Sequence, residues 1–229
     1  FAYDDEFRTF VLADQYSFGD VVLYLKEPDG ERKLLFGAPM DARRPGEQVA
    51  PNGIGSAHLR PGGGLVFVSS IYDDSYGLTY MRLADPAKVD PVRISGLVHT
   101  GIGEFNQIEH LAGDRYMLKY NIDGASWVYE GAFDEANLAF SVTRVLVGEG
   151  ELSNGVLQSI AFDEDSGRYV LSFSSATTPS QLYVIEPDGT VLRQTNERVL
   201  GIPADYLSPG IESSYTSHDG LRISARLYL

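Results

Sequence analysis

Residues 23–30, LYLKEPDG, return almost unchanged as residues 182–189, LYVIEPDG. Each copy reads as a short apolar strand that runs into a Pro-Asp-Gly turn. The spacing between Leu23 and Leu182 divides into three steps of about 53 residues, which is the size of one blade of a β-propeller. This pair of segments therefore predicts a repeat architecture built from strands.

Weaker copies of the same strand lie between these two segments, at 78–81 (LTYM) and 127–130 (WVYE). A second repeated strand precedes each of them, and a glycine-containing turn precedes most copies of that strand. The copies of this second strand are 7–13, 65–70 (LVFVSS), 115–120 (RYMLKY) and 168–175 (RYVLSFSS). The repeat unit is thus predicted to be one four-stranded antiparallel blade.

We predict a nearly all-β chain, a β-propeller or partial propeller of about four four-stranded antiparallel blades. Several strands are apolar on both faces, which suits sheets packed between neighbouring sheets. We expect the first blade to lack its innermost strand. The predicted blades are approximately 1–37, 53–96, 101–148 and 154–201, within a propeller region 1–210.

The composition limits the partners of the chain. Its formal net charge of −14 opposes contact with nucleic-acid phosphates and anionic lipids, so we expect neither nucleic acid nor membrane as a partner. The sequence has no cysteine, which excludes disulfides and thiol chemistry. No apolar run approaches the length of a membrane span. These features leave the compartment open, with the cytoplasm slightly favoured.

The end of the chain carries a family resemblance. Residues 211–228, IESSYTSHDGLRISARLY, resemble the crossover hairpin of the prolyl oligopeptidase family of serine peptidases, which leads from the last propeller blade into an α/β-hydrolase domain. The repeated Arg-Tyr-aliphatic strand, followed by Ser-Ser and then Leu-Tyr-Val, is also similar to the blades of that family. Together the two features extend over nearly the whole chain.

The resemblance implies a propeller that caps a catalytic domain of the same polypeptide and restricts its access to peptide substrates. Residues 211–229 would then be the crossover hairpin toward that domain. The chain departs from the family plan because it has too few blades and no Gly-x-Ser-x-Gly motif, the strained turn that carries the nucleophile. We therefore assign no catalytic residue and no cofactor, and expect residues 1–229 alone to be inactive.

Two pairs of side chains are candidate functional residues. His58 and His110 occupy matching positions before the second strand of consecutive blades, so both imidazoles are candidates to face a central channel. Arg43 and Arg44 form a basic pair in a loop, and guanidinium groups grip carboxylates in a two-pronged geometry. We therefore consider the arginines as ligands for a substrate carboxylate. The opposing interpretation for both pairs is an ordinary structural or solvated role.

Two glycine-bearing loops, 53–56 (GIGS) and 101–104 (GIGE), look superficially like the start of a dinucleotide-binding motif. Neither supplies the third glycine or the long helix that this motif needs. We interpret them as equivalent loops between blades, positioned to contact a substrate or an adjoining domain.

The alternative function comes from a different class of protein. A free-standing small propeller would bind a ligand or a protein partner without catalysis, and the terminal hairpin would close the ring by supplying the strand that the first blade lacks. A metal-dependent lactonase-type propeller is a third option, but the sequence shows no matching set of acidic and amide ligands.

Overall fold

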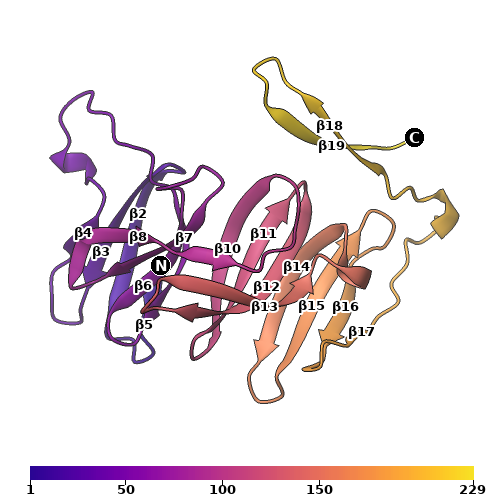
Figure 1. Cartoon of the computed structure of the whole chain (residues 1–229), viewed down its shortest axis with the longest axis horizontal. Coiled ribbons are helices and arrows are strands. Elements are labelled where there is room, and N and C mark those ends of the chain that lie inside the picture. The colour runs from indigo at the N-terminus through magenta and orange to yellow at the C-terminus, as the bar shows by residue number, and fades with distance from the viewer. The chain divides into compact units, whose positions relative to one another are not determined.

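The computed structural model describes residues 1–229 except for the side chain of residue 204, and Figure 1 shows several small sheets. The described residues contain no α-helix. Short 3₁₀ turns lie at η1 (Met40–Ala42), η2 (Gly150–Leu152) and η3 (Ala204–Tyr206). Four successive sheets each contain four consecutive strands in meander order, which is the topology of propeller blades. The prediction of an all-β partial propeller is therefore confirmed.

The first sheet has the order β1-β2-β3-β4, with a core of buried aliphatic residues on its central strand. Its strands are β1 (Ala2–Tyr3), β2 (Phe10–Ser17), β3 (Asp20–Lys26) and β4 (Lys33–Phe36). We expected this blade to lack its innermost strand, and that expectation is wrong. The two-residue strand β1 fills the position, because Ala2 pairs with Val11 and Tyr3 with Phe10.

The second sheet has the order β5-β6-β7-β8 and is the most deeply buried. Its strands are β5 (Ile54–Arg60), β6 (Gly64–Ser69), β7 (Gly77–Arg82) and β8 (Asp85–Pro91). All six residues of β6 are buried, including its one polar side chain, Ser69. The Ser69 hydroxyl lies 2.7 Å from the hydroxyl of buried Thr79 on β7. Both faces of this strand are thus covered, and its hydroxyl has a partner.

The third sheet contains an additional strand that the sequence did not predict. Its order is β10-β11-β12-β13-β9. The strands are β9 (Arg93–Ser95), β10 (Gly103–Ala112), β11 (Arg115–Ile122), β12 (Ala125–Asp134) and β13 (Ala139–Val147). Strand β9 follows the second blade and pairs in parallel with β13, where Ile94 lies opposite Phe140. The connection between two blades therefore contributes an edge strand to the later one.

The fourth sheet has the order β14-β15-β16-β17 and buries mainly one face. Its strands are β14 (Gly155–Asp163), β15 (Arg168–Ser175), β16 (Gln181–Ile185) and β17 (Val191–Arg193). Tyr169, Leu171 and Phe173 of β15 are buried, but Val170 between them is 47% exposed. The other exposed apolar side chains of this sheet are Val156, Leu182 and Leu192. An exposed apolar face of this kind is typical of a surface that another element covers.

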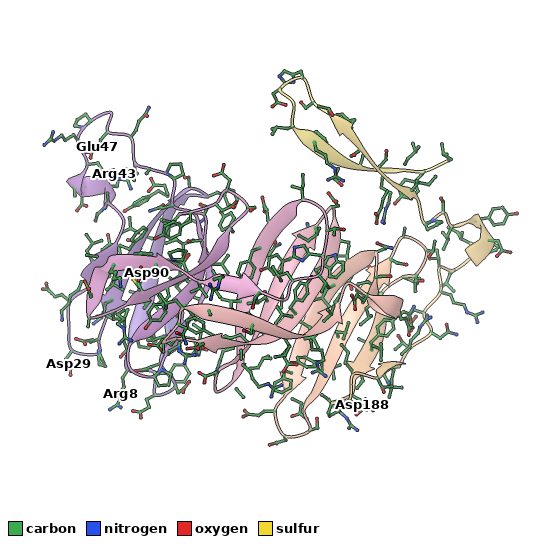
Figure 2. The ribbon with its side chains drawn as sticks, viewed as in Figure 1. Arg8, Asp29, Arg43, Glu47, Asp90 and Asp188 are labelled. Atoms are coloured by element: carbon green, nitrogen blue, oxygen red, sulfur yellow. The ribbon has the colours of Figure 1, made fainter. Side chains whose placement is uncertain are left out.

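The two copies of the octapeptide, at 23–30 and 182–189, form the same turn. In the first copy the Gly30 N–H donates to the Glu27 carbonyl at 3.2 Å, and in the second the Gly189 N–H donates to the Glu186 carbonyl at 2.9 Å. Figure 2 labels the aspartates of these two turns, Asp29 and Asp188. The turns join β3 to β4 and β16 to β17. The repeat detected in the sequence is therefore a structural repeat.

The backbone contacts divide the chain into two compact units. The first consists of Phe1–Leu97, Glu104–Leu118 and Gly131–Val142, and the second of Val98–Gly103, Lys119–Glu130 and Thr143–Leu229. The terminal strands β18 (Ile211–Thr216) and β19 (Arg222–Leu227) belong to the second unit and form their own two-stranded sheet. Among the described residues, no helix is long and apolar enough to cross a membrane.

A buried asparagine links the second blade to the first. Asn52 is 6% exposed, and its side-chain amide pairs with the backbone of Val21 in β3. Asn52 Oδ1 accepts a hydrogen bond from the Val21 N–H at 2.8 Å, and Nδ2 donates to the Val21 carbonyl at 2.9 Å. The amide therefore satisfies two buried backbone groups as a neighbouring strand would.

Replacing Asn52 with Ala should lower the free energy of unfolding by about 2 kcal/mol, because both Val21 groups would be left buried without partners. Asn137→Ala is the matched control, since Asn137 is exposed and bonds only to Asp134 in the described structure. Urea unfolding of the two variants measures the difference. Equal midpoints would show that Asn52 has no special role.

Candidate functional site

The structure brings His58 of β5 and His110 of β10 together. Their rings stack with centroids 4.0 Å apart and planes 18° from parallel. Both rings also contact Tyr116, at centroid distances of 5.5 and 5.0 Å. His110 Nε2 lies 2.9 Å from the Gly113 carbonyl, which assigns the proton of that ring to Nε2. The two histidines thus form one aromatic cluster, and their orientation toward a channel stays a prediction.

The stacked pair favours an uncharged imidazole at His58. Burial lowers the pKa of His58 to about 4, and the adjacent His110 and Arg60 act in the same direction. A neutral imidazole is suited to hydrogen bonding or metal ligation. The described residues contain no group of three or more His, Cys, Asp or Glu side chains positioned to hold a metal ion. The arrangement therefore supports a packing role more directly than a metal centre.

Next to this cluster lies Arg60, an arginine that the sequence analysis did not single out. Arg60, at the end of β5, donates to Asp114 at 2.6 Å, to Glu135 at 2.9 Å and to the Tyr116 hydroxyl at 2.8 Å. Its guanidinium also lies 5.2 Å from the centre of the Phe133 ring. With 11% of its side chain exposed, Arg60 is a largely buried cation that bonds to three side chains of the neighbouring blade.

Glu135, in the turn after β12, gathers three donors from the second blade. Tyr80 donates to it at 2.5 Å, Arg60 at 2.9 Å and Arg82 at 3.3 Å. Although burial alone would raise it, these hydrogen bonds hold the pKa of Glu135 below its usual value. The pKa of Tyr80 is raised to about 12 by burial and by its bond to this carboxylate. Glu135 is therefore ionised and Tyr80 uncharged at neutral pH. Their hydrogen bonds join two blades within the first unit.

The second unit contains a similar arrangement, in which a different arginine pairs with a glutamate and packs against a tyrosine. Arg144 of β13 donates to Glu130 at 2.7 and 3.2 Å and to the Pro187 carbonyl at 3.1 Å. Its guanidinium lies 5.4 Å from the centre of the Tyr169 ring. Tyr169 occupies the position in β15 that Tyr116 occupies in β11. In both units an arginine therefore packs over the tyrosine of a second strand.

The two candidate arginines, Arg43 and Arg44, lie in the loop between β4 and β5 but have different environments. Arg43 donates to both carboxylate oxygens of Asp20, at 2.6 and 2.7 Å, and packs 5.1 Å from the centre of the Tyr16 ring. Arg44 is exposed, and its backbone N–H donates to Glu47 at 2.8 Å. Figure 2 labels Arg43 and Glu47 on this loop. The Arg43 guanidinium thus anchors the loop, whereas that of Arg44 is presented to solvent, where substrate binding stays a prediction.

The terminal hairpin is a self-paired element. Ser213 pairs with Ala225 and Tyr215 with Ile223, and every residue of β18 and β19 is exposed. The alternative model required this hairpin to complete the first sheet, but β1 already occupies that position. That ring-closing role is therefore wrong. The hairpin is connected to the blades of its own unit through Arg222, which donates to Asp123 at 2.7 and 3.2 Å.

Solved structures of peptidases share this fold. A prolyl endopeptidase matches 97% of the chain with a TM-score of 0.69 and 15% identity, and the match covers 29% of that protein. Prolyl oligopeptidase B from Galerina marginata matches 97% with a TM-score of 0.66 and 13% identity, over 29% or 30% of its length. Oligopeptidase B from Leishmania major matches 97% with a TM-score of 0.62 and 13% identity, over 30% of its length.

These matches show that the chain shares its fold with one part of each of these peptidases. The chain spans about 30% of the length of these structures. No protein-family model matches the sequence, and no curated protein does so either. The fold is therefore shared with these peptidases at low sequence identity.

Replacing Arg60 with Met should lower the free energy of unfolding by roughly 3 kcal/mol, because it leaves Glu135 and Asp114 without their shared cation. Arg82→Met is the matched control, since Arg82 contacts the same glutamate from a side chain that is 63% exposed. We expect less than about 1 kcal/mol for this control. Chemical denaturation measures the free energy of unfolding of both variants. An equal decrease in the two would contradict the structural role of Arg60.

The stability of the chain should depend on pH through His58. Its pKa is about 4 in the folded chain and about 6.5 when unfolded, so the unfolded state binds more protons between these values. This contribution is complete above pH 6.5 and falls by roughly 2 kcal/mol as the pH drops to 4. His58→Gln should lose this part of the pH dependence, whereas the exposed His218→Gln should keep it. An NMR midpoint for His58 near 6.5 would contradict the account.

Proposed function

We propose that this chain is the propeller portion of a serine peptidase of the prolyl oligopeptidase type. The observation that carries the proposal is the fold likeness over 97% of the chain. In such a protein an α/β-hydrolase domain of the same polypeptide would follow the hairpin. The resemblance of residues 211–228 to the family crossover segment supports this arrangement independently of the fold comparison.

The role that we propose for the propeller is to restrict the access of peptides to that catalytic domain. A ring of blades admits short or unstructured chains and excludes folded proteins by size. Prolyl oligopeptidase B from Galerina marginata has been solved with a 35mer substrate, so a protein of this fold accepts a peptide of that length. The parent chemistry would be acyl transfer from the peptide to a serine and then to water. The described chain contributes access and binding rather than the nucleophile.

The full-length protein tests this proposal. A fluorophosphonate probe should label one serine of the full-length protein and leave residues 1–229 alone unlabelled. The full-length protein should also cleave the unstructured peptides of a casein digest much faster than folded lysozyme. Absence of labelling would contradict the peptidase assignment. Equal cleavage of peptides and folded protein would contradict the gating role while leaving the assignment intact.

A further inference from the structure

The terminal hairpin carries no buried side chain, so apolar packing does not fix its orientation. All six residues of β18 and all six of β19 are exposed. A charged contact within the second unit joins it to a blade instead. Arg222, the first residue of β19, donates to both carboxylate oxygens of Asp123 at 2.7 and 3.2 Å. This two-pronged geometry constrains direction as well as distance.

The surrounding backbone fixes the position of Asp123. It lies in the turn between β11 and β12 with a φ of 50°, in the left-handed region, and is followed by Gly124 with a φ of 83°. Aspartate tolerates this conformation better than most residues. The Asp123 N–H donates to the Ile102 carbonyl at 2.9 Å. The turn is therefore held against the loop that precedes β10.

The second glycine-bearing segment of the sequence runs from that loop into β10, and its glycines leave room for the turn that carries Asp123. A Cβ at Gly101 would lie 2.4 Å from Asp123 Oδ2, and the φ of Gly101 is +120°. A Cβ at Gly103 would lie 1.8 Å from the Asn121 carbonyl oxygen. The two glycines thus permit close approach of the turn that bears the carboxylate. This requirement accounts for the two glycines of this segment.

The electrostatics of the pair favour its closed form at neutral pH. The hydrogen bonds from Arg222 lower the pKa of Asp123, against a smaller opposing effect of burial. The bond to Asp123 likewise raises the pKa of Arg222. The Asp123 side chain is 21% exposed and that of Arg222 is 40% exposed. Water therefore screens the pair partly, and the contact is weak enough to open and close.

Elsewhere the base of the hairpin stands beside an open hollow. A cavity of about 540 Å³ lies between the hairpin base and the loops of the fourth sheet. Its polar lining includes Ser153, Asn154, Ser175, Thr177, Glu212 and Arg226. On this side the hairpin base and the loops are therefore separated by open space, whereas at Asp123 the hairpin is hydrogen-bonded to a blade.

We propose that Asp123 and Arg222 form a latch that positions the hairpin and thereby controls the access of peptides to the catalytic domain. The control of entry rests on the proposed function, whereas the latch itself does not. Both are positioning residues. A partly exposed pair of this kind shifts an open-closed equilibrium by about threefold, a change that matters for a gate but not for folding.

The latch is tested directly in residues 1–229. Since the chain has no cysteine, spin labels at Asp165→Cys and His218→Cys report the distance between the fourth sheet and the hairpin tip without interference. Asp123→Asn keeps the turn conformation and Arg222→Ala removes the donor. Each should broaden the distance distribution and raise the open fraction about threefold. Gly101→Ala should act in the same direction by displacing the carboxylate.

Arg226→Ala is the matched control for this experiment. Arg226 lies on the same strand as Arg222 but pairs with Glu212 across the hairpin, at 3.7 Å. Its removal should leave the distance distribution unchanged. An unchanged distribution in Asp123→Asn or Arg222→Ala would overturn the latch, and so would equal broadening in Arg226→Ala.

The gating role is tested separately in the full-length protein. Asp123→Asn should raise kcat/KM for long casein peptides about threefold relative to short ones, with the pH profile unchanged. Equal changes for long and short peptides, or none, would overturn the gating role. Failure of the serine label in the wild-type protein would instead refute the proposed function. The distance measurement decides the latch in either case.

Discussion

Burial of both faces of the central strands is the constraint on which the rest of this structure depends. A strand such as β6, with all six residues buried, is stable only inside a sheet that has neighbours on both sides. Stacking sheets in this way also buries the polar groups at their edges. Each of those groups then needs a partner from the adjoining blade. The Asn52 amide and the Arg60 and Arg144 ion pairs meet this requirement at different places in the chain.

The sequence predicted the elements that repeat locally and missed those that depend on distant pairing. The octapeptide at 23–30 and 182–189 identified two equivalent turns because turn chemistry lies within a few residues. By contrast, Arg60 and Glu135 are far apart in the chain, and neither belongs to a recognisable motif. Strand β9 was missed because three residues give no periodic signal. It exists because the edge of β13 is available for pairing.

The candidate residues show the same limit. The sequence placed His58 and His110 at matching positions in consecutive repeats, and the structure shows that these positions are adjacent. The sequence contains no signal for their face-to-face stacking or for the low pKa of His58, because both result from packing. Arg43 and Arg44 are adjacent in the chain but differ in environment. Only the position of Asp20 across the loop distinguishes an anchoring arginine from an exposed one.

The regions to which we assign a function are those in which the sheets are not covered on both faces. The fourth sheet leaves an apolar face exposed, and the hairpin that follows has no buried residue. Such surfaces are typical of contacts with a further part of a protein. The glycine loop at 101–103, the turn at Asp123 and Arg222 connect this region to the blades. A propeller segment with such an end is suited to work together with a second domain.

We propose that this propeller is part of a two-domain serine peptidase, and the coding sequence downstream of Leu229 tests this proposal most directly. The account predicts an open reading frame of roughly a domain's length that contains Gly-x-Ser-x-Gly followed by an Asp and then a His. A stop codon immediately after Leu229 would contradict it.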